Sequence, residues 1–187
     1  PEQLRVSGSE LDAAYQQVSK ELLEAIQLAR TQIEAFHRQR VPKSWVQFKD
    51  DEVVLGKRYT PVDRAGIYVP GGRAAYPSTV LMNAIPAKVA GVSRIVMVTP
   101  PASQMLRQGE DGVETESASL AKGGNVSVPP INPAVLVAAQ EAGVHEIYRV
   151  GGAQAIAALA YGTETIPKVD VITGPGNIYV CLLYTSD

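Results

Sequence analysis

Apolar residues recur at alternating steps of three and four along the first forty residues, which is the spacing of one face of an α-helix. The stripe consists of Leu11, Tyr15, Val18, Leu22, Ile26, Ala29, Ile33 and Phe36. Ser7 with Glu10 forms a capping box at its start, and Ser19 is a second capping residue. The pattern predicts an amphipathic helical segment over residues 1–40 that breaks near Val18 and packs against its own chain. A coiled coil or dimer seam is the alternative.

Over residues 41–63 the helical pattern is replaced by short β-favouring pieces. These pieces are Trp45–Phe48, Val53–Leu55 and Lys57–Thr60. An acidic stretch over residues 49–52 and the single Gly56 separate them, so the segment predicts an antiparallel hairpin or meander. Carboxylates at a hairpin tip are ordinary solvated turn residues, and we therefore assign no chemistry to them.

From residue 64 onward, short apolar runs alternate with helical stretches, without a hairpin signal between the runs. The runs predict strands at 65–69, 94–99, 146–150 and 169–173, and the stretches between them predict helices at 78–90, 133–142 and 153–161. Such alternation with right-handed crossovers gives an α/β fold whose parallel sheet has helices on both faces. Pro86 lies inside the first of these helices and predicts a kink or a split there.

Residues 102–130 differ from their surroundings. They contain four acidic residues and four glycines but no aromatic residue. A segment of this composition cannot bury enough apolar surface to order itself. We therefore expect a mobile surface insertion at 102–130, with a lid over a substrate as the alternative.

Three predicted strands end in glycine-rich turns: Pro70-Gly71-Gly72, Gly151-Gly152 and Gly174-Pro175-Gly176. Taken singly, such turns are ordinary features of α/β proteins. In open parallel sheets, however, ligands bind beyond the carboxyl ends of the strands, where glycine lets backbone N–H groups approach closely. Together the turns predict one crevice for a phosphate-bearing or nucleotide ligand. Neither a G-x-G-x-x-G motif nor a Walker lysine pattern occurs at them.

Composition narrows the classes of partner. The 187 residues are 45% hydrophobic, enough for the core of one ordinary domain. Seventeen basic and nineteen acidic residues give a formal charge of -2, which does not favour nucleic acid or an anionic membrane. The single cysteine excludes an internal disulfide framework, and the sequence has neither a bilayer-spanning run nor a signal-peptide layout. We expect a cytoplasmic protein.

Both ends of the chain indicate a fragment. It begins at Pro1 without methionine, and its last residues, 181–187, follow directly after the third glycine turn. These residues, which include the only cysteine, Cys181, resemble a translated sequencing adaptor. We expect 181–187 to be an artefactual tail and N-terminal and C-terminal parts to be missing. A genuine short apolar terminus is the alternative.

Several long motifs in register resemble histidinol dehydrogenase. They are Ile67–Gly72, Tyr76–Met82, Val150–Ala160 and Gly174–Asn177. The resemblance extends from about Val6 to Val180, is weakest in the hairpin and is absent from the expected insertion. It implies a homodimeric enzyme, dependent on NAD and zinc, that oxidises L-histidinol through L-histidinal to L-histidine, the last step of histidine biosynthesis. It also implies an incomplete Rossmann-like fold for residues 64–180.

Carried over by position, the family's NAD contacts fall on Tyr68, Gln154 and Asn177. Their chemistry suits the role, since a phenol can stack and hydrogen-bond while amide side chains both donate and accept. Without the resemblance, a strand tyrosine, a first-turn amide and a turn asparagine would be read as structural residues.

The resemblance also implies what is missing. The family's zinc ligands and its glutamate-histidine base lie beyond the third glycine turn, so we expect no catalytic or metal-binding residue in this chain and no activity from it alone. His37 and His145 match no family ligand and are interpreted as structural or surface residues. Two alternatives stay open: a related zinc- and NAD-dependent dehydrogenase of another small polar alcohol, and a non-catalytic nucleotide- or anion-binding module.

Overall fold

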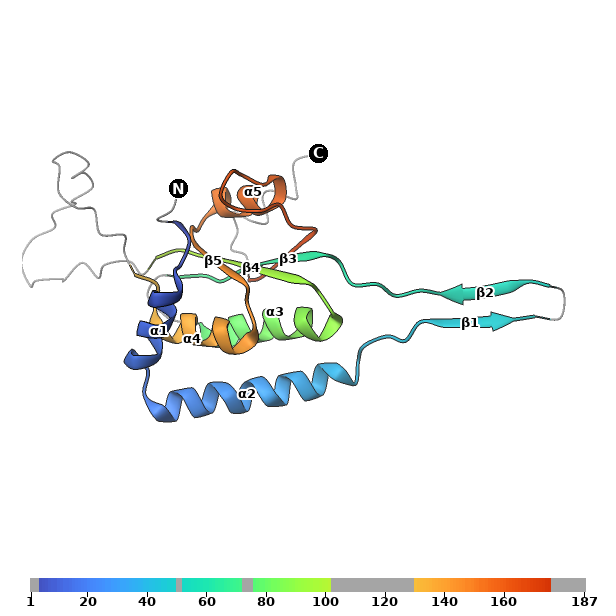
Figure 1. Ribbon diagram of the computed structural model, residues 1–187, viewed down its shortest axis with the longest axis horizontal. Helices are drawn as coiled ribbons and strands as arrows, with labels where there is room; N and C mark the ends of the chain where they lie inside the picture. The colour runs from blue at the N-terminus through green and yellow to red at the C-terminus, as the bar shows by residue number, and fades with distance from the viewer. Residues whose placement is uncertain (1–3, 50–51, 72–75, 102–129, 176–187) are drawn as a thin grey trace, which may run out of the picture.

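The computed structural model describes residues 4–49, 52–71, 76–101 and 130–175 (Figure 1). Most of the expected insertion at 102–130 and all of the tail at 181–187 lie outside these residues. The elements are, in chain order, α1 (Gly8–Gln17), α2 (Lys20–Arg38), β1 (Trp45–Phe48), β2 (Val54–Lys57), β3 (Arg64–Tyr68), α3 (Pro77–Ala90), β4 (Arg94–Thr99), α4 (Pro133–Ala142), β5 (Glu146–Arg149), α5 (Ala153–Tyr161) and β6 (Val171–Thr173).

A four-stranded parallel sheet forms the centre of the molecule, with the strand order β5-β4-β3-β6. The inner strand β4 is buried along its length except at Arg94, because helices cover both faces of the sheet. This architecture confirms the predicted α/β fold. The edge strand β6 is shorter than the apolar run at 169–173 indicated, since only Val171–Thr173 pair with β3.

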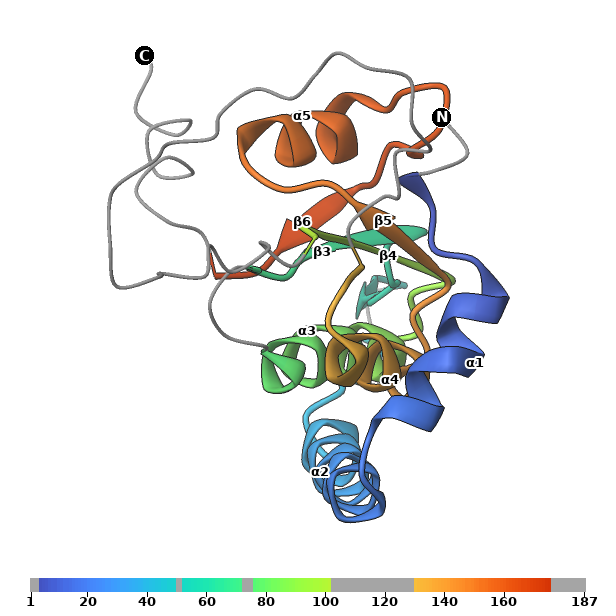
Figure 2. The same ribbon diagram turned by 90° about the vertical axis from the view of Figure 1, so that its left-hand side faces the viewer.

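The helices form layers on both faces of the sheet (Figures 1 and 2). Helices α3 and α4 cover one face, and α5 covers the other. The larger core lies between the sheet and the α3–α4 layer and includes Ile67, Ile95 and Val137, all with no exposed surface. The smaller core lies under α5, where Leu159 packs near Val98. Successive residues of a strand point to opposite faces of the sheet, so the strands contribute alternate residues to the two cores.

The N-terminal segment forms two helices that break where the sequence predicted. Ser7 and Glu10 complete the capping box of α1, Ser19 caps α2, and Val18 between them is extended. Both helices lie on the outside of α3 and α4 (Figure 2). Most of the predicted stripe packs there and Ile26 enters the larger core, but Leu22 and Phe36 are 38% and 57% exposed; Ala14, which lies outside the stripe, is buried as well. Packing against the same chain is thus confirmed. No described helix is both long and apolar enough to cross a membrane.

Glu141 on α4 ties both N-terminal helices to the body. Its carboxylate accepts hydrogen bonds from the Tyr15 hydroxyl (3.0 Å) on α1 and from Gln27 (3.3 Å) and Arg30 (3.0 Å) on α2. The side chain of Glu141 is only 11% exposed. Burial, followed by the hydrogen bond to Glu141, raises the pKa of Tyr15 to about 12, so this hydroxyl stays a donor at neutral pH.

Helix α3 runs without interruption from Pro77 to Ala90, so the split predicted at Pro86 does not occur. Proline removes one N–H from the helix ladder, which weakens one turn only. Ala84 and Ile85, just before it, are almost completely buried in the larger core. Packing of this face holds the two parts of the helix in one element, which is a case of tertiary contacts outweighing a local preference.

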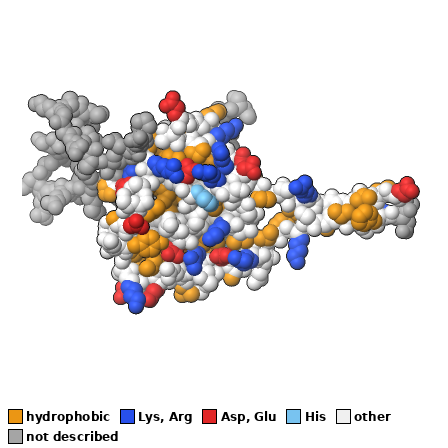
Figure 3. All heavy atoms as spheres, viewed as in Figure 1, with side chains coloured by type: hydrophobic (Ala, Val, Ile, Leu, Met, Phe, Trp, Pro, Cys, Tyr) orange, Lys and Arg blue, Asp and Glu red, His pale blue; other side chains and the backbone are white. Residues whose placement is uncertain are grey.

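The strands β1 and β2 form an antiparallel hairpin, which we call the arm, and it projects away from the rest of the molecule (Figure 1). The segment is a hairpin and not a meander, because the third predicted piece, Lys57–Thr60, forms no further strand. All eight strand residues are exposed, including Trp45 at 50% and Phe48 at 78%. Hydrophobic side chains accordingly gather along the arm (Figure 3).

The strand β5 carries a buried carboxylate, Glu146, which is 7% exposed. It accepts hydrogen bonds from the Tyr148 hydroxyl (2.6 Å) and from Arg94 of β4 (2.7 Å). Burial raises the pKa of Glu146, but these two hydrogen bonds and the attraction of Arg94 outweigh it, and the pKa is lowered overall. The charged Glu146 carboxylate therefore stabilises the pairing of β5 with β4 at neutral pH.

We predict that Glu146→Gln, which mimics the protonated acid, lowers the free energy of unfolding by about 1–2 kcal/mol at neutral pH. Because the folded-state pKa is lowered, the wild-type advantage is present above the unfolded pKa of about 4.3 and is lost as the pH falls through the folded value. Urea unfolding over a pH series measures this difference. Glu24→Gln, at a carboxylate whose side chain is 64% exposed, is the control and should change little at any pH. A Glu146→Gln deficit that persists unchanged in acid would contradict the prediction.

Candidate cofactor site at the carboxyl ends of the strands

The carboxyl ends of the four parallel strands meet at one edge of the sheet. The chain leaves β3 at Tyr68, β4 at Thr99, β5 at Arg149 and β6 at Thr173. Each strand is followed within a few residues by glycine or proline. The predicted glycine turns therefore come to the same edge, which is where ligands bind in open α/β sheets.

Pro100, directly after β4, lies between two of these turns. A Cβ atom added at Gly71 would lie 2.6 Å from Pro100 Cγ, and one added at Gly151 would lie 2.6 Å from Pro100 Cβ. Neither distance is possible for a real side chain, so both positions need glycine for packing alone. The sequence pattern attributed these glycines to ligand approach and did not single out Pro100. The only available signal was its place between two glycine-ended strands.

Tyr68 and Gln154, two of the three predicted cofactor residues, both lie against Gly152. The Gly152 N–H donates a long hydrogen bond to the Tyr68 hydroxyl (3.4 Å). Gly152 has a φ of +74°, and a Cβ atom there would lie 2.8 Å from Gln154 Oε1. The fold thus joins Tyr68 and Gly152, which are 84 positions apart in the chain. Asn177, the third predicted cofactor residue, lies outside the described residues.

The turn after β6 closes on the same tyrosine. Gly174 has a φ of +146°, and a Cβ atom at this position would lie 2.2 Å from the Tyr68 carbonyl oxygen. Only glycine fits this approach of backbone to backbone. Tyr68 is therefore in contact with the turns after β5 and β6 at once, and this makes it the centre of the described edge.

Helix α5 begins at this edge with Gly152 as its N-cap, and no side chain caps it. The first-turn N–H groups of a helix have no partner within the helix and carry partial positive charge. An anionic group such as a phosphate suits this place, because glycine at the cap lets it approach the backbone. The described edge therefore offers a phenol, an amide side chain and an uncapped helix end together.

The two histidines of the chain have ordinary structural surroundings. His145 Nδ1 accepts the Ile95 N–H at 3.1 Å, and the His37 ring packs edge-on against Phe36 with centroids 5.3 Å apart. Within the described part of the chain, no group of three or more His, Cys, Asp or Glu residues could hold a metal ion.

The parallel sheet with helices on both faces and glycine turns at one edge defines an open α/β protein, a class in which ligands bind at the carboxyl ends of the strands. Comparison with known proteins narrows this class. Residues 1–110 and 117–183 match the family profile described as histidinol dehydrogenase. The chain belongs to the histidinol dehydrogenase family.

Individual relatives agree with this family. The chain is 76% identical over 181 residues to histidinol dehydrogenase 2 of Trichormus variabilis, and 53% identical over 179 residues to histidinol dehydrogenase of Carboxydothermus hydrogenoformans. These alignments cover 97% and 96% of this chain and 36% of each relative. The crystal structure of histidinol dehydrogenase from Elizabethkingia anophelis superposes with a TM-score of 0.77 at 41% identity, over 95% of this chain and 35% of that one.

The extent of the match differs from the motif-based expectation in two respects. The family profile runs from residue 1 to residue 183, beyond the expected range of Val6 to Val180, and so includes the first three residues of the expected tail. The family profile covers most of the segment at 102–130 and leaves out only residues 111–116 between its two matched ranges. The motifs had indicated no resemblance in this segment, because it has few apolar residues and no distinctive motif. The chain spans about 36% of the length of the curated relatives that it matches.

We predict that Gly151→Ala lowers the free energy of unfolding by about 1–3 kcal/mol, because the new methyl group would overlap Pro100 and force the turn to move. Gly8→Ala is the matched control: no atom lies within 4 Å of a Cβ atom there, and alanine should be neutral or slightly stabilising. Urea unfolding of the two variants measures the difference. Equal midpoints would show that the turn after β5 is not tightly packed.

Proposed function

We propose that this chain provides the cofactor-binding side of an NAD-dependent histidinol dehydrogenase, which oxidises L-histidinol through L-histidinal to L-histidine in histidine biosynthesis. The observation that carries the proposal is the 76% identity that extends over 97% of the chain to a protein of that name. The convergence of Tyr68, Gly152 and Gln154 at one sheet edge supports a cofactor role for this part.

The residues of the described edge bind different parts of NAD. The uncapped start of α5 accepts the pyrophosphate, which carries the negative charge of the cofactor. The Gln154 amide hydrogen-bonds a polar group of the cofactor, and the Tyr68 phenol stacks on or hydrogen-bonds another. Asn177 is proposed as a third contact on the basis of the family motif. When bound, NAD supplies the hydride acceptor.

The overall reaction needs two cofactor molecules. Conversion of a primary alcohol to a carboxylate removes four electrons, and each NAD takes two electrons as one hydride. The first oxidation yields the aldehyde and NADH; the second consumes water, since the acid gains one oxygen, and yields NADH again. If the described edge holds the cofactor in both oxidations, it would release NADH and bind a second NAD between them.

Zinc is proposed as the second cofactor of the whole enzyme, as the family resemblance implies. The described residues do not fit a metal ion, since no group of three or more possible ligands occurs among them. We therefore assign no zinc ligand among the described residues. The family resemblance implies that the zinc ligands and the glutamate-histidine base lie beyond the third glycine turn.

We predict that the 187-residue chain binds NAD weakly and that Gln154→Ala raises the dissociation constant about fivefold, the effect of one net hydrogen bond. Isothermal titration calorimetry measures both. Gln140→Ala is the matched control, because Gln140 is exposed on α4 near its far end and should not affect binding. An absence of heat with NAD, or equal affinities for the two variants, would contradict the proposed half-site.

The same substitution tests the activity in a complete enzyme. The matching 181 residues of the Trichormus variabilis relative are replaced by those of this chain, and NADH formation from L-histidinol is followed. We expect turnover from the chimera and a raised KM for NAD with Gln154→Ala, with the KM for L-histidinol little changed. A folded chimera that forms no NADH would contradict the proposed activity.

We also propose a homodimer, which the arm supports. A two-stranded hairpin is marginally stable alone, yet this one exposes Trp45, Val46 and Phe48 by 50%, 64% and 78%. Exposed apolar surface of this extent on a projecting element is typical of a protein interface. A second copy is the partner that the family resemblance implies.

We predict that Trp45→Ser with Phe48→Ser in the chimera shifts the protein toward monomer, because these side chains supply much of the apolar surface of the arm. Sedimentation velocity measures the change. Leu28→Ser, which removes a side chain that is 60% exposed on α2, is the control and should leave the dimer intact. A dimer that survives loss of both aromatic residues would argue against the arm as an interface.

A further inference from the structure

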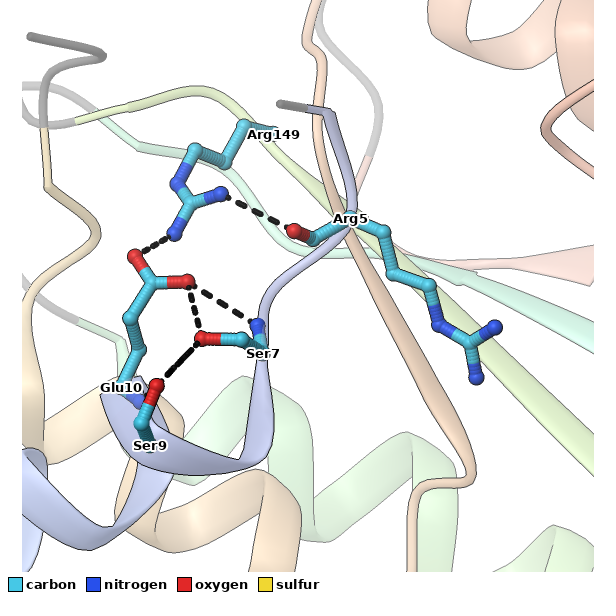
Figure 4. Close-up of polar contacts among 5 residues, drawn as sticks. All are labelled: Arg5, Ser7, Ser9, Glu10 and Arg149. Carbon is cyan, nitrogen blue, oxygen red and sulfur yellow. Dashed lines mark hydrogen bonds and ion pairs between the residues drawn. The ribbon is translucent and has the colours of Figure 1, made fainter. Parts of the chain in front are cut away.

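Arg149 is a buried cation at the end of β5, immediately before the turn that carries Gly151 and Gly152. Its side chain is only 5% exposed. It points toward α1, where it forms an ion pair with Glu10 (Figure 4). A buried arginine needs such a partner, because an uncompensated charge is strongly disfavoured in the interior. The position of this strand end thus depends on a residue 139 positions earlier in the chain.

The Glu10 carboxylate is itself held by the capping box of α1. One oxygen pairs with Arg149, and the other accepts the Ser7 N–H and the Ser7 hydroxyl, both at 2.9 Å (Figure 4). Burial raises the pKa of Glu10, but the hydrogen bonds from Arg149 and Ser7 together lower it by more than burial raises it. The pKa is therefore lowered overall. Glu10 therefore faces Arg149 as a carboxylate at neutral pH.

The segment before α1 runs alongside the same strand. Arg5 forms an antiparallel bridge with Tyr148, and the Val6 N–H donates to the Ile147 carbonyl at 2.9 Å. Arg149 also donates to the Arg5 carbonyl at 3.2 Å. The edge of β5 is thereby covered, and its last residue is held from two directions, by the N-terminal backbone and by the Glu10 side chain.

The end of β5 borders a cavity of about 270 Å³ between α1 and α4, whose lining includes Glu10, Arg149 and Leu136. The Arg149 side chain is buried, and its hydrogen bonds to Glu10 and to the Arg5 carbonyl hold the guanidinium group on the α1 side of the strand. The pairing of Arg149 with Thr99 of β4 and the contact of Gly151 with Pro100 hold the backbone of the same strand end. Three residues further on, Gly152 contacts the Tyr68 hydroxyl through a hydrogen bond that is already long, at 3.4 Å.

We propose that Glu10 and Arg149 are positioning residues for the edge of the sheet: their ion pair fixes the end of β5 and so holds Gly152 against Tyr68. The ligand of that edge rests on the proposed function, whereas the positioning itself does not. Neither residue contacts the proposed cofactor; both act through the turn at Gly151 and Gly152.

The test compares amide hydrogen exchange at Gly151 and Gly152 by NMR in the wild-type chain and in Glu10→Gln. We expect exchange at these two amides to become about tenfold faster in the variant, with a rise of similar size in the NAD dissociation constant. Arg149→Met should have at least as large an effect, because it also removes the hydrogen bond to the Arg5 carbonyl. The double variant should be no worse than Arg149→Met alone, because both substitutions break the same Glu10–Arg149 pair.

Two controls separate positioning from general loss of stability. Glu34→Gln removes an equivalent Glu–Arg pair on α2, between Glu34 and Arg38, and should leave both glycine amides unchanged. Glu141→Gln weakens the attachment of α1 and α2 and lowers stability without touching β5. Its effect should spread over α1 and α2 and not concentrate at Gly151 and Gly152.

Unchanged glycine exchange in Glu10→Gln would overturn the proposal, and so would an equal local effect of Glu141→Gln. If faster exchange in Glu10→Gln is accompanied by no NAD binding even in the wild-type chain, the positioning role stands and the proposed cofactor is wrong. If NAD binds with unchanged affinity while exchange at the turn becomes faster, the turn moves but does not contribute to the site, and the positioning role for cofactor binding is rejected.

Discussion

The close contact of Pro100 with Gly71 and Gly151 is the constraint on which the proposed site depends. It brings the ends of β3, β4 and β5 closer together than any side chain at the two glycines would allow. Tyr68 can reach Gly152 only because these ends are so close. Packing within the chain therefore requires glycine at both positions. The proposed ligand would use the same absence of side chains to approach the backbone.

The N-terminal helices belong to the same packed unit as the sheet. Ala14 and Ile26 share the larger core with Ile67, and Glu141 receives hydrogen bonds from both helices. Through Glu10 and Arg149 the first helix also reaches the strand end that leads into the site. The helices thus cover the core and connect to the site, while the segment before α1 covers the outer edge of β5. The arm, by contrast, packs on none of these layers (Figure 1).

Much of this could be predicted because it is local in the chain. The three-four spacing of apolar residues identified α2, Ser7 with Glu10 marked the start of α1, and alternating runs indicated a parallel α/β sheet. Tyr68 and Gln154 were found by motif resemblance, and the structure places both against Gly152. Their role as cofactor contacts, like that of Asn177, stays a prediction. At Pro86 the sequence predicted a kink or a split, and α3 is not split. The burial of the neighbouring residues, which holds the helix together, could not be seen from the sequence.

The sequence by itself determined the elements, their caps, the glycine turns and the family, since each depends on residues near one another or on a motif in register. Only the tertiary structure decided the strand order β5-β4-β3-β6, the place of Pro100 between two turns, and the pairing of Glu10 with Arg149. These features join residues that are far apart in the chain. Which residues meet depends on which apolar faces are buried against each other and which charged groups are buried as pairs. The spacing of residues along the sequence does not contain that information.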